Sequence, residues 1–281
     1  MKNVIYIFGM GMIGGSLALS LKKNKLAKKI FAYDKNKKSL ISAKQKKLID
    51  AYDFSNFSHL QQADLIIVCT PIGAYRQIFK IIKKYMSKDC IITDVGSTKT
   101  SIVTEAEKIF GNKQKCFIGS HPLAGKEKSG VSNAESNLFL NTTVIITPTS
   151  KTNKNLLSKI KNFWKKIDCK VEILSPLLHD VIMSETSHVP HLISYSLVNS
   201  IFRNKNIKNI HNFTGGGFKD FARIAKSNPI MWRDICQHNK KNIAASLGLF
   251  INDLKSLRKQ VQQNDFQKLY NLFKKTRQKL S

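Results

Sequence analysis

The sequence lacks any apolar run of about eighteen residues, the length that a transmembrane helix requires. Its first residues enter an apolar stretch of only about five residues, which is too short for the core of a secretory signal peptide. We therefore expect a cytoplasmic protein with no membrane partner.

Cysteine is also sparse. The five cysteines are scattered along the chain, their number is odd, and no two of them have C-x-x-C spacing. This pattern argues against a zinc site or a disulfide framework and favours reduced, mostly buried thiols. We expect no bound metal.

Arginine is scarce in a chain that is otherwise strongly basic. The net charge is +29, yet only six of the 47 basic residues are arginine. Nucleic-acid-binding proteins favour arginine for bidentate contacts, and the lysines here are spread along the chain instead of forming one stripe. We expect no nucleic-acid partner, although the charge would attract small anionic ligands over long distances.

The apolar segments that are present predict an α/β fold. Seven of them read as strands, and helical patterns separate most of these strands. Such alternation is typical of a Rossmann-like, mainly parallel sheet that is covered by helices on both faces. The predicted strands are 4–8, 30–33, 64–69, 90–95, 115–118, 143–146 and 170–174.

The pattern changes after residue 174. Ser175-Pro176 interrupts it, and from there apolar residues recur at helical spacing with no convincing strand. We therefore predict a dinucleotide-binding domain at 1–174 and an all-helical domain at 175–281. One long apolar face could pack within the subunit or against a second subunit; it consists of Ile243, Leu247, Phe250, Leu254, Leu257 and Val261.

A glycine loop follows the first predicted strand. In this G-x-G-x-x-G pattern, Gly9 allows a tight turn, Gly11 lets the backbone approach a pyrophosphate, and Gly14 lets the next helix pack on the strand. The pyrophosphate would meet free N–H groups at the helix start, where Met12 and Ile13 lie.

The second predicted strand ends at an acidic residue. Asp34 lies twenty residues beyond Gly14, where a carboxylate binds the ribose hydroxyls and repels a 2′-phosphate. We therefore expect NAD in preference to NADP, although the neighbouring lysines at 35, 37 and 38 oppose this preference. Thr70 and Pro71, which close the third predicted strand, are further candidates for contact with the cofactor.

Four later segments carry a family resemblance. They are DVGSTK at 94–99, GSHPLAGKEKSG at 119–130, SHVPH at 187–191 and GGFKDFARIA at 216–225. Together with the glycine loop, they resemble the prephenate dehydrogenase family of tyrosine biosynthesis, over nearly the whole chain. The resemblance implies a helical domain that forms a homodimer. It also implies NAD-dependent oxidation and decarboxylation of prephenate to 4-hydroxyphenylpyruvate, with arogenate as the alternative substrate.

The resemblance implies two catalytic residues. His121 matches the family's catalytic histidine, and a neutral imidazole suits removal of a proton from the substrate's ring hydroxyl. Ser97 would lie near the nicotinamide and the substrate hydroxyl and help to orient His121. A helix N-cap is the alternative role for Ser97, and a solvated position in the first helical turn is the alternative for Lys99.

The resemblance also implies a set of substrate-binding residues. Arg223 would hold a carboxylate of the diacid with its forked guanidinium, and its alternative is a salt bridge with Asp220, itself a pocket candidate. His191 would line the pocket, and His179 is a weaker candidate. Glu127 would gate the pocket or form a surface salt bridge.

Two other function classes stay open. A non-catalytic NAD-binding protein would need the glycine loop but neither His121 nor Arg223. A 3-hydroxy-acid dehydrogenase would use a lysine on a helix of the second domain, such as Lys240, and would leave the His121 segment unexplained.

Overall fold

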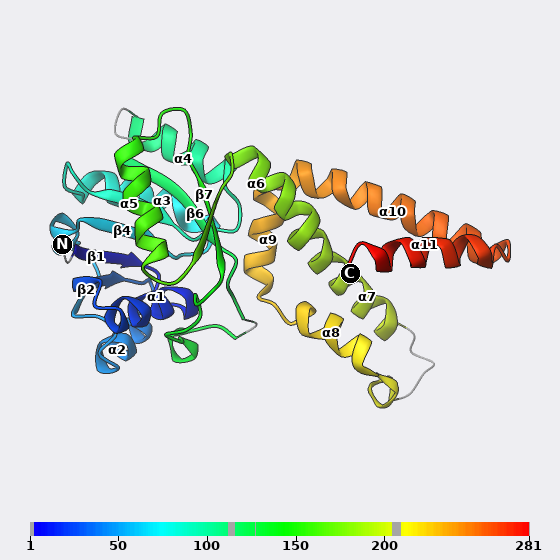
Figure 1. Ribbon diagram of the computed structural model, residues 1–281. Coiled ribbons are helices and arrows are strands. Elements are labelled where there is room, and N and C mark those ends of the chain that lie inside the picture. Colours follow the sequence, from blue (N-terminus) through cyan, green and yellow to red (C-terminus); the bar gives the residue numbers. More distant parts are fainter. Residues whose placement is uncertain (1–2, 112–115, 127, 204–208, 281) are drawn as a thin grey trace.

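The computed structural model describes residues 3–111, 116–126, 128–203 and 209–280. An α/β domain forms the amino-terminal part of the chain, and an elongated group of helices extends from it (Figure 1). The chain passes from one to the other between β8 (Lys170–Ile173) and α6 (Pro176–Met183).

One sheet of eight strands organises the α/β domain, in the order β3-β2-β1-β4-β5-β6-β7-β8. Neighbouring strands are parallel, except that β6 and β7 are antiparallel. The strand order reverses between β1 and β4, so the carboxyl ends of these strands form the crevice where such sheets bind ligands. The other strands are β1 (Asn3–Phe8), β2 (Ala27–Tyr33), β3 (Ala51–Asp53), β4 (Leu65–Val68), β5 (Ile91–Asp94), β6 (Phe117–Pro122) and β7 (Thr143–Thr147).

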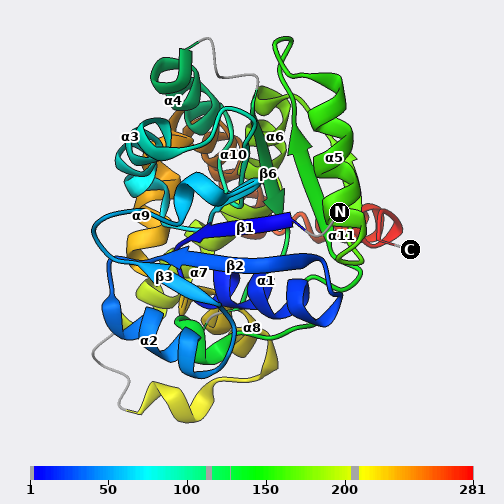
Figure 2. The ribbon, with the colours of Figure 1, turned by 90° about the vertical axis from the view of Figure 1, so that its left-hand side faces the viewer.

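Alternate residues of the central strand enter two separate cores. Ile5 and Ile7 of β1 pack with α1 (Met12–Lys23), α2 (Lys37–Gln45) and α5 (Lys154–Lys165). Tyr6 and Phe8 face the opposite way and pack with α3 (Tyr75–Tyr85) and α4 (Thr100–Phe110). The helices therefore cover both faces of the sheet, as Figure 2 shows. This confirms the predicted fold class.

The strand prediction was wrong in two places. It missed β3, which has only three residues and no apolar run. It also ended the fifth predicted strand at residue 118, whereas β6 continues to Pro122. That extension exists because Gly119–Pro122 pair with Val144–Thr147 of β7, a long-range contact that local sequence does not reveal. His121 consequently lies inside a strand and not after one.

Helices make up the described chain beyond β8. The sequence runs through α6, a π-helical turn at Ser184–His188, and five further α-helices with a short 3-10 turn at Ile210–Phe213. The hairpin of α10 and α11 projects away from the α/β domain (Figure 1). The helices after the π-turn are α7 (Val189–Arg203), α8 (Gly216–Ala225), α9 (Pro229–His238), α10 (Lys240–Gln262) and α11 (Phe266–Gln278).

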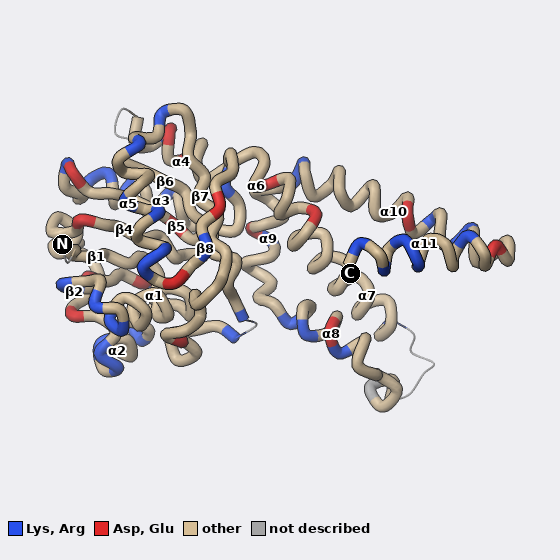
Figure 3. Tube along the Cα trace, viewed as in Figure 1, with Lys and Arg blue, Asp and Glu red and all other residues tan. Residues whose placement is uncertain are grey.

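Basic side chains occur over both parts of the molecule. Figure 3 shows Lys and Arg on α2, on α8 and along α11, in keeping with the dispersion of lysine in the sequence. Within the described ranges, no helix combines the length and the apolar character needed to cross a membrane.

Candidate active site

The glycine loop joins β1 to α1 through very close backbone contacts. Gly9 has a φ of +95°, and a Cβ atom there would lie 2.7 Å from the Cys69 carbonyl oxygen. A Cβ atom on Gly14 would lie 2.0 Å from the Gly9 carbonyl oxygen. At Gly11 a Cβ atom would meet nothing within 4 Å. The first and third glycines are therefore required by packing, and the space over the second is open to a ligand.

The surroundings of this loop fit a dinucleotide. No side chain caps the start of α1, so the amides of its first residues, Met12 and Ile13 among them, face outward at the positive end of the helix dipole. Asp34 accepts the Met10 amide at 2.7 Å through Oδ2 and the Asn36 amide at 2.8 Å through Oδ1. Each carboxylate oxygen thus keeps a lone pair for a ribose hydroxyl.

The end of β4 contributes another polar group to the loop. The Thr70 hydroxyl is buried and has no hydrogen-bond partner among the described residues. The Thr70 amide nitrogen also lies 3.0 Å from the position that a Gly9 Cβ would occupy. Pro71 precedes the short helical turn that leads into α3. An unpaired buried hydroxyl beside the loop is a further sign that a polar ligand belongs there.

His121 lies near the carboxyl end of β6 and contacts a second histidine. Its Nδ1 atom is 2.8 Å from Nε2 of His179 on α6. The other ring nitrogen of His179, Nδ1, is 2.8 Å from Oδ1 of Asp180. His179 and Asp180 are almost fully buried, and His121 is 9% exposed. The three side chains form a line that runs from helix α6 to the sheet.

This line fixes the protonation state of each ring. Burial raises the pKa of Asp180, but hydrogen bonds from His179, Thr100 and backbone amides outweigh it and leave that pKa lowered. An ionised carboxylate only accepts, so His179 donates through Nδ1 and accepts through Nε2. His121 therefore donates through Nδ1, and its Nε2 atom carries a lone pair.

His121 is held in its neutral form. Burial lowers the pKa of His121 well below its ordinary value, and positive charge on the neighbouring His179, Lys99 or His188 would lower it further. A neutral imidazole with an unprotonated Nε2 is a proton acceptor at neutral pH. His179, a weaker pocket candidate from the sequence, is the direct partner of His121.

Asp180 also caps a helix of the α/β domain. Its carboxylate accepts the backbone amides of Lys99 at 2.7 Å and Thr100 at 2.9 Å, at the start of α4. The alternative role for Ser97 as an N-cap is therefore wrong: the N-cap residue is Lys99, and the capping carboxylate comes from α6. Ser97 itself is partly buried in the turn after β5.

The alternative role for Lys99 as a solvated residue is also wrong. Its side chain is fully buried, and Nζ lies 2.5 Å from Oδ2 of Asp94 and 2.7 Å from the Ser120 carbonyl oxygen. Burial lowers the pKa of Lys99, and Asp94 opposes that shift. Asp94 also accepts the Ser120 amide at 3.0 Å. The Lys99–Asp94 ion pair thus anchors the residue that immediately precedes His121.

A second group of predicted residues lies in the helical part. The His191 ring on α7 stacks on Trp232 of α9, with ring centroids 3.9 Å apart, and its Nδ1 atom contacts the Ser187 carbonyl oxygen at 2.8 Å. Burial lowers the pKa of His191, and the charge of Arg223 adds to that effect. Arg223 and Asp220 are exposed on α8, whereas Glu127 falls outside the described residues.

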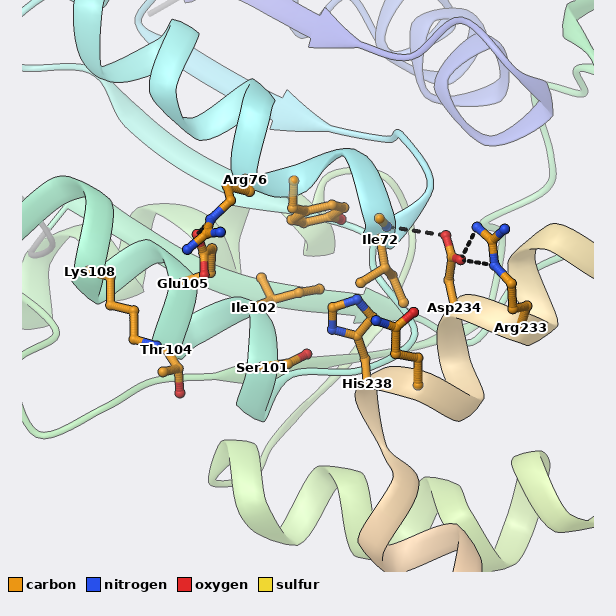
Figure 4. A pocket seen from close by; sticks show the side chains of 13 residues that line it. Ile72, Arg76, Ser101, Ile102, Thr104, Glu105, Lys108, Arg233, Asp234 and His238 are labelled. Atoms are coloured by element: carbon orange, nitrogen blue, oxygen red, sulfur yellow. Dashed lines mark hydrogen bonds and ion pairs between the residues drawn. The ribbon is translucent and has the colours of Figure 1, made fainter.

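The cavity drawn in Figure 4 adjoins these residues but is lined by others. It has a volume of about 680 Å³ between α3, α4 and α9, and its lining includes Arg76, Glu105 and Asp234 but none of the predicted site residues. We therefore locate the candidate site from the side-chain geometry. Among the described residues, no group of three or more His, Cys, Asp or Glu side chains could hold a metal ion.

The residues that hold His121 in place were not predicted from the sequence. Asp180 directly follows His179, and Asp94 ends a buried strand at the carboxyl edge of the sheet, where ligand sites form. Both signals were present in the sequence. What it lacked was any sign that α6 returns to the start of α4. Lys240, the lysine of the 3-hydroxy-acid alternative, is exposed at the start of α10.

Two family models match consecutive parts of the chain. One is described as the nucleotide-binding domain of prephenate dehydrogenase and matches residues 17–173; the other is described as its dimerization domain and matches residues 175–275. The chain belongs to the prephenate dehydrogenase family.

Individual family members are similar over nearly the whole chain. The Bacillus subtilis prephenate dehydrogenase is 36% identical over 276 residues, which are 98% of this chain and 74% of that protein. The cyclohexadienyl dehydrogenase of Zymomonas mobilis is 31% identical over 97% of this chain and 93% of its own length.

Solved structures of family members share the fold. A crystal structure of prephenate dehydrogenase from Aquifex aeolicus, in complex with hydroxyphenyl propionate and NAD+, has a TM-score of 0.93 and 35% identity, and the match covers 99% of this chain and 97% of that one. The arogenate dehydrogenase of Synechocystis has a TM-score of 0.81 and 28% identity, over 97% of each chain.

Proposed function

We propose that this member of the prephenate dehydrogenase family oxidises and decarboxylates prephenate with NAD, and that His121 is its catalytic base. The observation that carries the proposal is the buried line from His121 through His179 to Asp180. It presents an unprotonated Nε2 atom at the same carboxyl edge of the sheet as the glycine loop. The product would be 4-hydroxyphenylpyruvate, in tyrosine biosynthesis.

The chemistry requires one base that can also return a proton. NAD, when bound, accepts the hydride from the ring carbon that bears the hydroxyl group. His121 takes the hydroxyl proton through Nε2 as that carbon–hydrogen bond breaks. The ring carboxylate departs as carbon dioxide, and its electron pair completes the aromatic ring. His121 then returns the proton to the phenol oxygen, so no net proton is released.

Burial of His121 favours this role. A base with a lowered pKa stays unprotonated over the neutral pH range and is ready to accept a proton. His179 and Asp180 hold the ring in the correct tautomer, as an orienting carboxylate does for other catalytic histidines. Ser97, in the turn after β5, is proposed to contact the ring hydroxyl and the nicotinamide.

The substrate's carboxylates require cations on the other side of the ring. Arg223 is proposed to bind one carboxylate, since a guanidinium offers two parallel donors. His191 lies within the electrostatic reach of Arg223 and is held by its stacking on Trp232. Asp220, on the same helix as Arg223, and Glu127 remain candidates for contact with the substrate or its entrance.

The cofactor contacts follow from the glycine loop. Gly9, Gly11, Met12, Ile13 and Gly14 are proposed to bind the pyrophosphate. Asp34 is proposed to bind the adenosine ribose, and Thr70 and Pro71 to border the cofactor. Because Asp34 would repel a 2′-phosphate, we propose that NAD is used in preference to NADP.

Arogenate is the second candidate substrate. It differs from prephenate in carrying an ammonium group where prephenate carries a keto group. Related proteins act on either compound: the Synechocystis structure is an arogenate dehydrogenase, and the Bacillus subtilis relative is a prephenate dehydrogenase. The higher identity to the latter favours prephenate.

One assay tests the function. NADH formation is measured by absorbance with prephenate and with arogenate, each in the presence of NAD or NADP. We expect the highest kcat/KM with prephenate and NAD. No NADH from either substrate would contradict the enzymatic function, while a higher kcat/KM with arogenate would assign that substrate instead.

We further propose a homodimer formed through the helical domain, residues 175–281. The apolar face of α10 is buried only at its start: Ile243 is 5% exposed, whereas Leu254 and Val261 are 47% and 56% exposed. On the adjoining α11, Phe266 and Phe273 are 60% and 59% exposed. Apolar patches of this kind mark interfaces between subunits. Light scattering should give twice the mass of one chain; the mass of a monomer would contradict the proposal.

The domain boundary and the location are proposals of the same kind. A boundary at residue 174 is supported by the end of β8 at Ile173 and the start of α6 at Pro176. We propose a cytoplasmic location, in keeping with the similar proteins that are named prephenate dehydrogenase and cyclohexadienyl dehydrogenase.

A further inference from the structure

His188 is a buried histidine that lies outside the line from His121 to Asp180. It ends the π-helical turn at Ser184–His188, in which the Val189 amide bonds the Ser184 carbonyl oxygen. The next residue, Pro190, has no amide proton, which favours such a departure from regular α-helix. His188 is 1% exposed and lies between two parts of the site. The centroid of its ring is 6.1 Å from that of Trp232, and Asn239 links the ring to the Asp180 backbone.

A single asparagine determines which nitrogen of His188 carries the proton. Asn239 donates through Nδ2 to the Asp180 carbonyl oxygen at 2.7 Å, and its Oδ1 atom accepts from Asn242 at 2.8 Å. A carbonyl oxygen only accepts, so the orientation of the Asn239 amide is fixed. The same Nδ2 atom lies 3.2 Å from Nδ1 of His188. Nδ1 must therefore accept, and the proton resides on Nε2.

The His188 ring lies close to the turn that carries Ser97. The Asn239 side chain that contacts the ring also bonds the Asp180 carbonyl oxygen, and the Asp180 carboxylate accepts the amides that follow this turn at 99 and 100. Nε2 is inaccessible to solvent, and none of the described residues forms a hydrogen bond with it. Burial lowers the pKa of His188 to about 4, while the Ser97 backbone acts to raise it, as a carbonyl oxygen beside an imidazole N–H does. A buried donor without a partner is costly, so a complete bond is expected in the working enzyme.

We propose that His188 is a positioning residue for Ser97: its Nε2–H donates to the Ser97 backbone carbonyl and thereby ties α7 to the turn after β5. Ser97 would contact the substrate hydroxyl beside His121, so this inference rests on the proposed function. Asn239 sets the direction of the His188 donor and is joined to Asp180 as well. One network thus sets both the catalytic base and the Ser97 turn.

Two substitutions of His188 test the roles of its two ring nitrogens separately. His188→Asn places an amide oxygen near the position of Nδ1, which keeps an acceptor for Asn239 but cannot reach Ser97. His188→Gln places an amide N–H near the position of Nε2 and keeps the donor. We expect kcat for prephenate to fall about ten-fold in His188→Asn, the equivalent of one lost hydrogen bond, and to recover largely in His188→Gln.

A double-mutant cycle with Ser97→Ala makes the test specific. If His188 acts through Ser97, His188→Asn should lower kcat in the wild type and have little further effect in Ser97→Ala. An equal loss in both backgrounds would overturn the proposal, and so would an unchanged kcat in His188→Asn alone. Ser194→Ala is the control, because the Ser194 hydroxyl is also fully buried in α7 and has no hydrogen-bond partner within the described ranges, and we expect its kcat to be unchanged.

An NMR measurement keeps the inference separate from the proposed reaction. In protein carrying 15N-labelled histidine, the His188 signal, assigned by its loss in His188→Asn, should show a proton on Nε2 with or without NAD. A proton on Nδ1 would overturn the inference whatever the enzyme's substrate is. Failure of wild-type turnover alongside a protonated Nε2 would instead refute the proposed function. Urea unfolding of each variant establishes that it is folded.

Discussion

The Nδ1 atom of His121 lies 2.8 Å from the Nε2 atom of His179, although the two residues are 58 positions apart in the chain. His121 belongs to β6, which is parallel to β5 and antiparallel to β7. His179 belongs to α6, the first helix after the sheet. The contact therefore forms only when α6 docks against the carboxyl edge of the sheet. The orientation of the His121 ring therefore depends on the junction between the α/β domain and the helical part.

Removal of the base should abolish turnover without loss of the cofactor. In His121→Asn we expect kcat for prephenate to fall by a factor of about 10² to 10⁴, the usual contribution of a general base. The NAD dissociation constant, measured by calorimetry, should stay near that of the wild type because the glycine loop is untouched. A kcat like that of the wild type would remove His121 from the mechanism.

Substitution of His179 should act through the tautomer of His121. His179→Leu removes the acceptor of the His121 Nδ1–H group, so the proton can move to Nε2 and block the base. We expect kcat to fall at least about ten-fold, the free-energy equivalent of one hydrogen bond, with little change in the KM for NAD. His179→Gln, which can place an amide oxygen near the position of Nε2, is the matched control and should retain more activity. Equal kcat values for the two variants would argue against the orienting role.

Loss of Arg223 should weaken substrate binding selectively. In Arg223→Ala we expect the KM for prephenate to rise by a factor of about 10 to 100, because charge-assisted hydrogen bonds contribute about 1.5–3 kcal/mol. Arg223→Lys keeps the positive charge but loses the two parallel donors of the guanidinium. Its KM for prephenate should therefore lie between those of the wild type and Arg223→Ala. The KM for NAD should change little in both variants. An unchanged KM for prephenate in Arg223→Ala would refute the assignment.

The buried pair of Lys99 and Asp94 should be important for stability. Lys99→Met leaves the Asp94 carboxylate buried and unpaired, which costs about 3–5 kcal/mol of unfolding free energy. Urea denaturation at neutral pH measures this loss. The double variant Lys99→Met/Asp94→Asn removes both charges and should be more stable than Lys99→Met alone. If Asp94→Asn restores none of the unfolding free energy lost in Lys99→Met, the unpaired Asp94 charge does not explain that loss.

Acid should destabilise the fold through its buried histidines. The pKa of His188 is lowered to about 4 in the folded chain, against about 6.5 in an unfolded chain. Between these values the unfolded state binds more protons, so the unfolding free energy decreases as the pH falls. His188 alone should account for about 2 kcal/mol between about pH 6.5 and about pH 5. His188→Asn should show a shallower decrease, and parallel decreases in both proteins would contradict this origin.

The sequence by itself determined the features that depend on local pattern. The G-x-G-x-x-G spacing after an apolar strand, with Asp34 closing the next strand, predicts a dinucleotide loop because each position has a local steric or electrostatic requirement. Alternating strands and helices predict the parallel sheet. The family motifs were sufficient to single out His121 and Arg223 as candidates.

Only the tertiary structure decided which side chains surround the base. Lys99 has the sequence context of a solvated residue, yet its side chain is buried against Asp94 and Ser120 of the sheet. The docking of α6 lets Asp180 cap α4 at the Lys99 amide. His179 becomes the partner of His121 for the same reason. Contacts between segments that are distant in the chain depend on how the helices dock on the sheet. The spacing of residues within one segment does not predict them. The pairing of β6 with β7, which places His121 within a strand, has the same cause.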